Sequence, residues 1–135
     1  METYRGIVYP HQEDHMGHMN VQWYTSKFDE ATWHLFSAGG LTAKYLKTNN
    51  RGMAALEQMT KYKAEVFAGD LLLIKSHFLE VNNKTLRFFH TMVNAETGVD
   101  VATSELVGAH LDKERRKACP FPDNIKEKCQ SLLKV

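Results

Sequence analysis

The feature that most limits the possible folds is one long segment with helical periodicity, followed by strand-like segments separated by turn residues. Between Val21 and Phe36 apolar residues recur mainly at spacings of three and four, as on the buried face of a helix. They are Val21, Tyr24, Phe28, Ala31, Trp33, Leu35 and Phe36. Gly39-Gly40 ends this predicted helix. A first strand is predicted over Thr3–Tyr9, and Pro10 ends it because proline lacks a backbone donor.

Four strand-like segments follow a loop around Thr48–Gly52. They are Met53–Ala64, Leu71–Val81, Thr85–Asn94 and Val99–Leu111. The separators are turn formers: Ala68-Gly69-Asp70, Asn82-Asn83-Lys84 and Glu96-Thr97-Gly98. Turns of this kind between successive strands predict an antiparallel meander. The tail, Asp123–Val135, has apolar residues at helical spacing and is predicted to form a short amphipathic helix.

This order of elements predicts an α+β domain. One apolar helix and one antiparallel sheet can bury each other only if the sheet wraps the helix or packs across it. A chain of 135 residues with 43% hydrophobic residues is long enough for one substantial core. We therefore expect a single domain over residues 1–135.

Charge and hydropathy exclude several classes of partner. The formal net charge is +1, so no global field favours nucleic acid or a membrane surface. The N-terminal residues have no apolar signal core, and no segment approaches the roughly 18 apolar residues of a membrane span. The expected location is cytoplasmic. Cys119 and Cys129 form neither a metal knuckle nor a disulfide framework and are expected to be reduced thiols.

The candidate for chemistry is the loop before the long helix, Asp14-His15-Met16-Gly17-His18-Met19-Asn20. A carboxylate beside a helix start can act as a nucleophile or as a general base. The N–H groups of the first helical turn, near Asn20 and Val21, can hold a developing oxyanion. Both parts of an acyl-transfer site can therefore lie in one segment. Asp14 is also a common residue in turns, and that structural reading stays open.

The other polar residues of this loop have structural alternatives. His18 can contact a substrate carbonyl or orient Asp14, or it can be an ordinary loop imidazole. Asn20 can be no more than the N-cap of the helix, which is compatible with aiming oxyanion donors. His11, His15 and His18 would form a metal-binding face only on a helix, and Pro10 and Gly17 favour a loop. No metal site is predicted.

Two motifs make the chain resemble the hotdog-fold acyl-CoA thioesterases of the 4-hydroxybenzoyl-CoA thioesterase type. The first is Asp14-x-x-Gly17-His18-Met19-Asn20-x-x-x-Tyr24, and the second runs from Tyr62 through Gly69-Asp70 into an apolar strand. The resemblance covers nearly the whole chain. It implies a five-stranded antiparallel sheet wrapped around the central helix, and dimers that often form tetramers. It also implies active sites at the subunit interface.

The resemblance assigns roles as well. Asp14 inherits the position of the nucleophile or water-activating base, and backbone N–H groups near Asn20 and Val21 inherit the oxyanion role. The implied reaction is hydrolysis of an acyl-CoA to a free acid and CoA, without a metal or redox cofactor. Two alternatives stay open: a hotdog hydratase or dehydratase, for which His18 would have to pair with an acidic residue across the subunit interface, and a noncatalytic acyl-CoA-binding module.

In a more particular form, His18 to Trp33 resembles the betainyl-CoA thioesterases of carnitine breakdown. Trp23, Tyr24 and Trp33, with Glu57 on the next strand, are the candidates for holding a quaternary ammonium, which aromatic faces and carboxylates attract. These aromatic residues can equally belong to the core, and Glu57 can face solvent.

CoA phosphates require cations, and no glycine-rich phosphate loop is present in the sequence. The candidates are basic residues near strand ends, each of which can also be solvated surface. They are Lys61, Lys63, Lys84 and Arg87, with Arg115-Arg116-Lys117 as a second group.

Overall fold

The computed structural model describes residues 1–134, and the chain forms two compact units. The first unit contains Met1–His34, Thr60–Ser76 and His90–Ser104. The second contains Leu35–Met59, His77–Phe89 and the residues from Glu105 onwards. The longest helix and four of the strands contribute residues to both units, so each unit has helix and sheet of its own.

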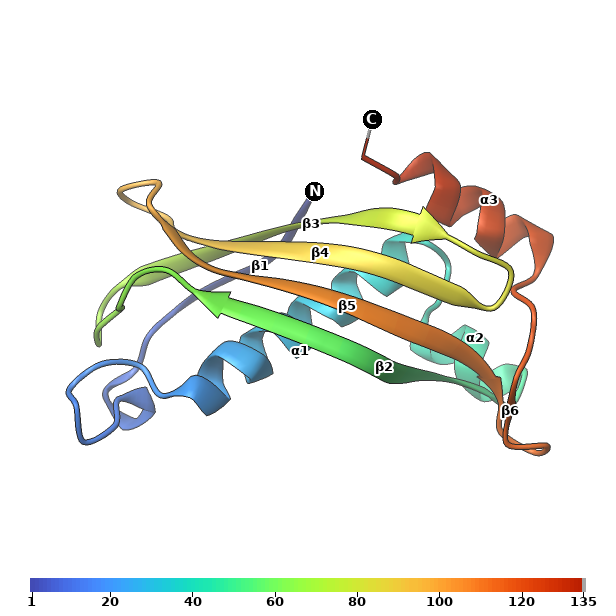
Figure 1. Ribbon diagram of the computed structural model, residues 1–135, viewed down its shortest axis with the longest axis horizontal. Coiled ribbons are helices and arrows are strands. Elements are labelled where there is room, and N and C mark those ends of the chain that lie inside the picture. Colours follow the sequence, from blue (N-terminus) through green and yellow to red (C-terminus); the bar gives the residue numbers. More distant parts are fainter. Residues whose placement is uncertain (135) are drawn as a thin grey trace. The chain divides into compact units, whose positions relative to one another are not determined.

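Figure 1 shows the elements in chain order, from β1 in blue to α3 in red. They are β1 (Glu2–Ile7), the 3-10 helix η1 (Pro10–Gln12), α1 (Val21–Ala38), α2 (Ala43–Thr48), β2 (Arg51–Tyr62), β3 (Leu71–Val81), β4 (Thr85–Asn94), β5 (Asp100–Asp112), β6 (Lys117–Ala118) and α3 (Asp123–Ser131). The predicted long helix and the strands β3 and β4 are confirmed. The tail helix begins where expected, and its predicted last residue, Val135, lies outside the described residues.

Three short elements, η1, α2 and β6, were not predicted, and the first strand is earlier than expected. The predicted loop at Thr48–Gly52 is preceded by helix α2, whose N-cap Thr42 accepts a hydrogen bond from the N–H of Tyr45. A six-residue helix is too short to show a full apolar period, which is why it was missed. Strand β6 has only two residues and pairs with the end of β5.

The predicted meander is wrong in one respect. The strand order is β1-β3-β4-β5-β2, with β6 pairing to β5, so β2 lies next to β5 and not next to β3. The strands β3, β4 and β5 do follow one another as a meander. The remaining architecture, an antiparallel sheet with one long helix and a C-terminal helix, agrees with the expected α+β class.

The connection between β2 and β3 explains this difference. In the first unit, the N–H of Ala64 donates to Val101 O on β5 at 3.1 Å. Further along, the N–H of Gly69 donates to Val8 O, which follows β1, at 2.8 Å. Residues 63–70 therefore run from β5 to the neighbourhood of β1. The turn at Gly69, with a φ of +96°, ends this crossing instead of closing a hairpin.

The core of the first unit joins α1 to the sheet. Its buried apolar residues are Val8, Met19, Tyr24, Phe28, Ala31, Val66, Leu72, Ile74, Met92, Val101 and Ala102. Spacings of three and four bring the helix residues of this set to one face of α1. This packing fixes the first turns of α1 against the segments that precede β3.

Strand β1 is tied to α1 by a buried lysine. The ammonium of Lys27, which is 5% exposed, donates to the Tyr4 hydroxyl at 2.8 Å and lies 5.2 Å from the centre of the same ring. Burial lowers the pKa of Lys27 and raises the pKa of Tyr4. A Cβ added at Gly6 would lie within 3.0 Å of the Tyr4 phenol, so this ring occupies the space above Gly6.

The second unit has a separate apolar core. It contains Leu35, Phe36, Leu41, Phe78, Leu86, Phe88, Leu106, Phe121, Ile125 and Cys129. Gly40, with a φ of +94°, ends α1 as predicted, and burial raises the pKa of the Cys129 thiol to about 11. Such a thiol is protonated at neutral pH and behaves as an apolar core atom. No helix within residues 1–134 is long and apolar enough to cross a membrane.

Candidate active site

The loop that carries the first motif folds back on itself in the first unit. Glu13 and Met19 form an isolated antiparallel bridge. Between them, the N–H of Asp14 donates to His18 O at 3.0 Å, and the N–H of Gly17 donates to Asp14 O at 3.0 Å. Gly17 has a φ of +81°, in the region where glycine carries little strain. The glycine of the motif is therefore required by this turn.

The Asp14 side chain is held in place by two donors. Its Oδ1 accepts from the N–H of Met16 at 2.9 Å, and its Oδ2 accepts from Asn20 Nδ2 at 3.4 Å. The Met16 hydrogen bond, more than any other contact, lowers the pKa of Asp14 below its ordinary value of 3.8, and nearby His18 acts in the same direction. Asp14 is therefore a carboxylate at neutral pH, oriented within the loop.

Asn20 is the N-cap of α1. Its Oδ1 accepts from the N–H of Gln22 at 3.0 Å, and its main-chain oxygen accepts from the N–H of Trp23 at 3.0 Å. These bonds use two of the donors that a helix start leaves without a partner. Val21, the first residue of the helix, lines the neighbouring pocket, whereas the N–H of Asn20, also predicted as an oxyanion donor, already donates to Gln12 O at 2.9 Å.

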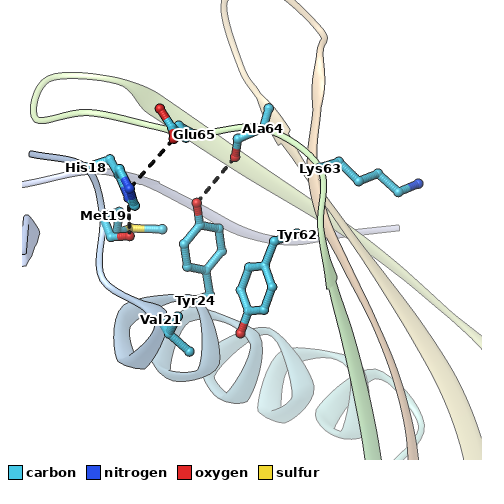
Figure 2. A pocket seen from close by; sticks show the side chains of 8 residues that line it. All are labelled: His18, Met19, Val21, Tyr24, Tyr62, Lys63, Ala64 and Glu65. Atoms are coloured by element: carbon cyan, nitrogen blue, oxygen red, sulfur yellow. Dashed lines mark hydrogen bonds and ion pairs between the residues drawn. The ribbon is translucent and has the colours of Figure 1, made fainter. Parts of the chain in front are cut away.

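A pocket of about 280 Å³ lies between the start of α1 and the segment that follows β2 (Figure 2). Its lining residues come from these two segments of the first unit: His18, Met19, Val21, Tyr24, Tyr62, Lys63, Ala64 and Glu65. The pocket therefore begins where the Asp14 loop joins the helix. It can receive a small group attached to a longer ligand.

Two tyrosine rings form the apolar wall. Tyr24 is 4% exposed, and its hydroxyl donates to Ala64 O at 3.4 Å. The ring of Tyr62 meets that of Tyr24 nearly at a right angle, at 88°, with centroids 5.0 Å apart. Burial raises the pKa of Tyr24, and the charges of Tyr62, Glu65 and Asp14 add to this increase. The phenol therefore stays protonated well above neutral pH.

His18 and Glu65 form the polar wall. His18 Nδ1 lies 3.4 Å from Met19 O, and Nε2 lies 3.7 Å from Glu65 Oε1 (Figure 2). Because a carbonyl oxygen can only accept, the Met19 contact favours a proton on Nδ1. The other ring nitrogen, Nε2, is then the one that lies beside the Glu65 carboxylate.

The structure brings together only some of the predicted site residues. His18, Val21, Tyr24 and Lys63 line the pocket, and hydrogen bonds join Asp14 and Asn20 to the same segment. The two tryptophans predicted to contact substrate lie elsewhere. Trp23 is half-buried with its ring 5.4 Å from that of His11, and the side chain of Trp33 is 43% exposed on α1; neither lines the pocket.

The charged residues predicted to contact substrate are dispersed. Lys61 is exposed on β2 in the first unit, and Glu57 and Lys84 are exposed residues of the second unit. Arg87, also in the second unit, pairs with Glu105 at 2.8 Å and lies 3.8 Å from Glu80, so its charge is compensated within the chain. Glu57 is not among the residues that line the pocket of the first unit.

Sequence reasoning missed Met19, Ala64 and Glu65 as lining residues and used Tyr62 only as a motif position. Tyr62 carried a usable signal, because it opens the second motif. Glu65 carried none, because its place depends on the crossing of residues 63–70 from β5 toward β1. Among residues 1–134, no three His, Cys, Asp or Glu side chains gather as a metal site would require.

Comparison of the sequence with protein families identifies one match. The profile described as the thioesterase-like superfamily matches residues 8–129. Among curated proteins, the L-carnitine dehydrogenase/betainyl-CoA thioesterase of Agrobacterium fabrum is 31% identical over 109 residues, covering 81% of this chain and 22% of that protein. The protein of the same name from a Rhizobium species is 24% identical over 122 residues, covering 90% and 24%. The chain thus spans about a quarter of the length of these relatives.

Solved structures share the architecture at low sequence identity. A Staphylococcus aureus protein in complex with CoA superposes with a TM-score of 0.91 at 19% identity, covering 100% of this chain and 87% of the other. A 1,4-dihydroxy-2-naphthoyl-CoA thioesterase from Synechocystis gives a TM-score of 0.84 at 17% identity, covering 96% and 95%. At such identities these likenesses concern the fold.

Proposed function

Because this chain belongs to the thioesterase-like superfamily and has the hotdog fold, we propose that it hydrolyses an acyl-CoA to a free acid and CoA. The observation that carries the proposal is the placement of Asp14. The ionised Asp14 carboxylate is oriented by its hydrogen bonds and is bonded to Asn20, which caps α1. Val21, the next residue, lines a pocket that can take a small acyl group. The site requires no metal or redox cofactor for this reaction.

Two routes lead to the same products. As a general base, Asp14 takes a proton from water while the water oxygen bonds to the thioester carbon, and the C–S bond then breaks to release CoA. As a nucleophile, Asp14 itself bonds to that carbon, CoA leaves, and water cleaves the resulting anhydride. In both routes the thiolate leaving group takes up a proton. The lowered pKa of Asp14 keeps it ionised for either role.

The start of α1 supports the developing negative charge. In both routes the carbonyl oxygen becomes an oxyanion, and the Val21 N–H is the donor that we assign to it. The partial positive charge of a helix N-terminus adds to this stabilisation. Asn20, by capping the helix, holds this first turn in place.

For the acyl group we propose betainyl-CoA, within carnitine breakdown, as the first candidate. Support comes from the curated relatives, whose matching regions cover most of this chain. The resemblance of residues 18–33 stated in the sequence analysis points the same way. Lys61 and Lys63, on and just after β2, are the candidates for the CoA phosphates. The expected cytoplasmic location stays a prediction.

We also propose a homodimer, which can pair further into a tetramer. Strand β2 is at the edge of the sheet, and its side chains Leu56 and Met59 are 59% and 64% exposed. An edge strand has unpaired backbone groups, and exposed apolar side chains beside them favour pairing with a second strand. Joining two copies through β2 would pair these backbone groups and bury these apolar side chains.

The first experiment measures release of free thiol from betainyl-, short aliphatic, branched and aromatic acyl-CoA. We expect Asp14→Asn to lower kcat by about 100-fold or more, because the amide is neither a base nor a nucleophile. The matched control is Asp29→Asn, the same change at an exposed position of α1, which should keep the wild-type rate. Wild-type rates in Asp14→Asn would refute the proposed mechanism.

Assays on the wild-type protein also distinguish the two alternatives, a hydratase and a noncatalytic binding module. A hydratase would pair a catalytic histidine with an acidic residue across the subunit interface, and His18 is the candidate histidine, so hydration of an enoyl-CoA is assayed in parallel. Hydration without thiol release would establish that reaction class. Saturable acyl-CoA binding without either reaction would identify a binding module, whose affinity Asp14→Asn would leave largely unchanged.

A further inference from the structure

The pocket contains a carboxylate for which neither hydrolytic route has a use. The Glu65 side chain is 65% exposed at the pocket wall. Within the part of the chain that the structure describes, its partner is the imidazole of His18, which makes an ion pair only when protonated, and their separation of 3.7 Å is longer than a good hydrogen bond. The charge of Glu65 is thus available to a ligand.

The aromatic wall lies beside this carboxylate. Tyr24, which is 4% exposed, and Tyr62 meet edge to face, so the ring that presents its edge is not covered on its faces by the other ring. Tyr62 is 49% exposed, so ligand atoms can reach its ring. An aromatic face attracts a cation that lies within about 6 Å of the ring centre.

Two carboxylates lie at or beside the pocket. Glu65 and Asp14 both act on Tyr24 and help to raise its pKa, so their charges reach the wall of the pocket. Lys63 is the cationic lining residue, and Figure 2 shows its side chain directed away from the two tyrosines. An anionic acyl group would be repelled here, and a cationic one attracted.

We propose that Glu65, together with the rings of Tyr24 and Tyr62, forms a subsite that selects acyl groups carrying a quaternary ammonium. The inference rests on the proposed thioester hydrolysis and adds the residues that decide its specificity. It replaces the earlier assignment of Trp23, Trp33 and Glu57. A trimethylammonium group presents apolar methyl groups with a diffuse positive charge, which suits tyrosine rings and a carboxylate at a distance better than a neutral group does.

The test compares two substrates of the same shape. Betainyl-CoA ends in a trimethylammonium group, and 3,3-dimethylbutanoyl-CoA has a carbon in place of the nitrogen. We expect the wild type to favour betainyl-CoA in kcat/KM by about tenfold, which corresponds to about 1.4 kcal/mol. Glu65→Gln should remove most of this preference by slowing betainyl-CoA hydrolysis, while the neutral substrate changes less than about twofold. Glu96→Gln, at an exposed turn, is the matched control and should change neither rate.

Equal losses on both substrates would overturn the subsite, because they would mean that Glu65 acts by orienting His18. A wild-type preference for the neutral substrate would overturn it as well. Tyr62→Leu tests the aromatic part separately and should also lower the betainyl preference.

Binding keeps this inference separate from the proposed function. Calorimetric affinities of both acyl-CoAs for Asp14→Asn need no turnover. A betainyl preference in binding, with no acyl-CoA hydrolysed by the wild type, would refute the hydrolase and keep the subsite. Hydrolysis of both substrates with equal affinities and equal rates would support the hydrolase and refute the subsite.

Discussion

The Asn20 side chain makes two contacts with different roles. Its Oδ1 caps α1 through the N–H of Gln22, and its Nδ2 donates to Asp14. The first contact stabilises the helix start, and the second holds the catalytic candidate. Because different atoms of one side chain make the two contacts, substitutions can separate them.

We predict that Asn20→Ser and Asn20→Ala differ in stability but not in the loss of activity. Serine is as good an N-cap as asparagine, so Asn20→Ser should unfold close to the wild-type urea midpoint, whereas Asn20→Ala should lose about 1 kcal/mol. Neither side chain can donate an amide N–H to Asp14, so both should lower kcat. Full activity in the folded Asn20→Ser protein would mean that the Asn20–Asp14 contact has no catalytic role.

The sequence could predict that the loop residues lie close together because their geometry is local, and their catalytic roles stay predictions. Asp14, His18 and Asn20 are close in the chain, so a turn and a helix cap bring them together. The aromatic residues could not be chosen in this way. Helical periodicity places Tyr24 and Trp23 on neighbouring faces of α1, and only the packing decides that Tyr24 meets the pocket.

At the scale of elements, strand existence was predictable and strand partners were not. Alternation and turn residues depend on the local chain, and they defined β3 and β4 with their observed bounds. The pairing of β2 with β5 depends instead on the path of residues 63–70, whose hydrogen bonds reach residues far away in the sequence. Glu65 was missed for the same reason.

A buried imidazole joins several elements of the second unit. His110 on β5 lies beside Cys119, and its Nδ1 donates to Cys119 O at 3.0 Å. Since Nδ1 carries the proton, Nε2 accepts from the Tyr45 hydroxyl of α2 at 3.0 Å. Burial lowers the pKa of His110, so this arrangement uses the neutral ring.

We predict that mild acid destabilises the protein through such histidines. The pKa of His110, and likewise that of His77, is lowered by burial below the ordinary value of 6.5, so the unfolded chain takes up protons at a pH where the folded chain does not. The free energy of unfolding should therefore be lower at pH 5.5 than at pH 7.5. Asp14 and Asp112 do not contribute to this difference, because their lowered pKa values matter only below about pH 4.

Urea unfolding of the wild type and His110→Gln at both pH values measures this effect. The variant should be less stable at pH 7.5 and should show a smaller loss between the two pH values. An unchanged loss would mean that His110 does not contribute to the pH dependence.

At the scale of the whole molecule, the α+β class followed from the order of elements, but association did not. In the sequence alone, the apolar side chains of β2 do not differ from those of an ordinary strand. Their exposure became evident only once β2 was placed at the edge of the sheet.

We predict that Leu56→Lys weakens the proposed dimer. Leu56 is 59% exposed, so lysine should fit the folded chain, but its charge would be buried where two β2 strands meet. Light scattering after size exclusion should show a dimer for the wild type and a larger monomer fraction for Leu56→Lys. Val99→Lys, at a position 54% exposed outside β2, is the control and should stay dimeric. A monomeric wild type would contradict the prediction.

The contact of the Tyr4 phenol with Gly6 limits how these two positions can change during evolution. A side chain at Gly6 would meet the phenol, so Gly6 can be replaced only if the Tyr4 ring shifts or becomes smaller. A smaller residue at position 4 would in turn leave Lys27 with Ile7 O as its acceptor among the described residues. We expect the three positions to be inherited together among close homologues, with lysine lost in those lineages that have lost tyrosine.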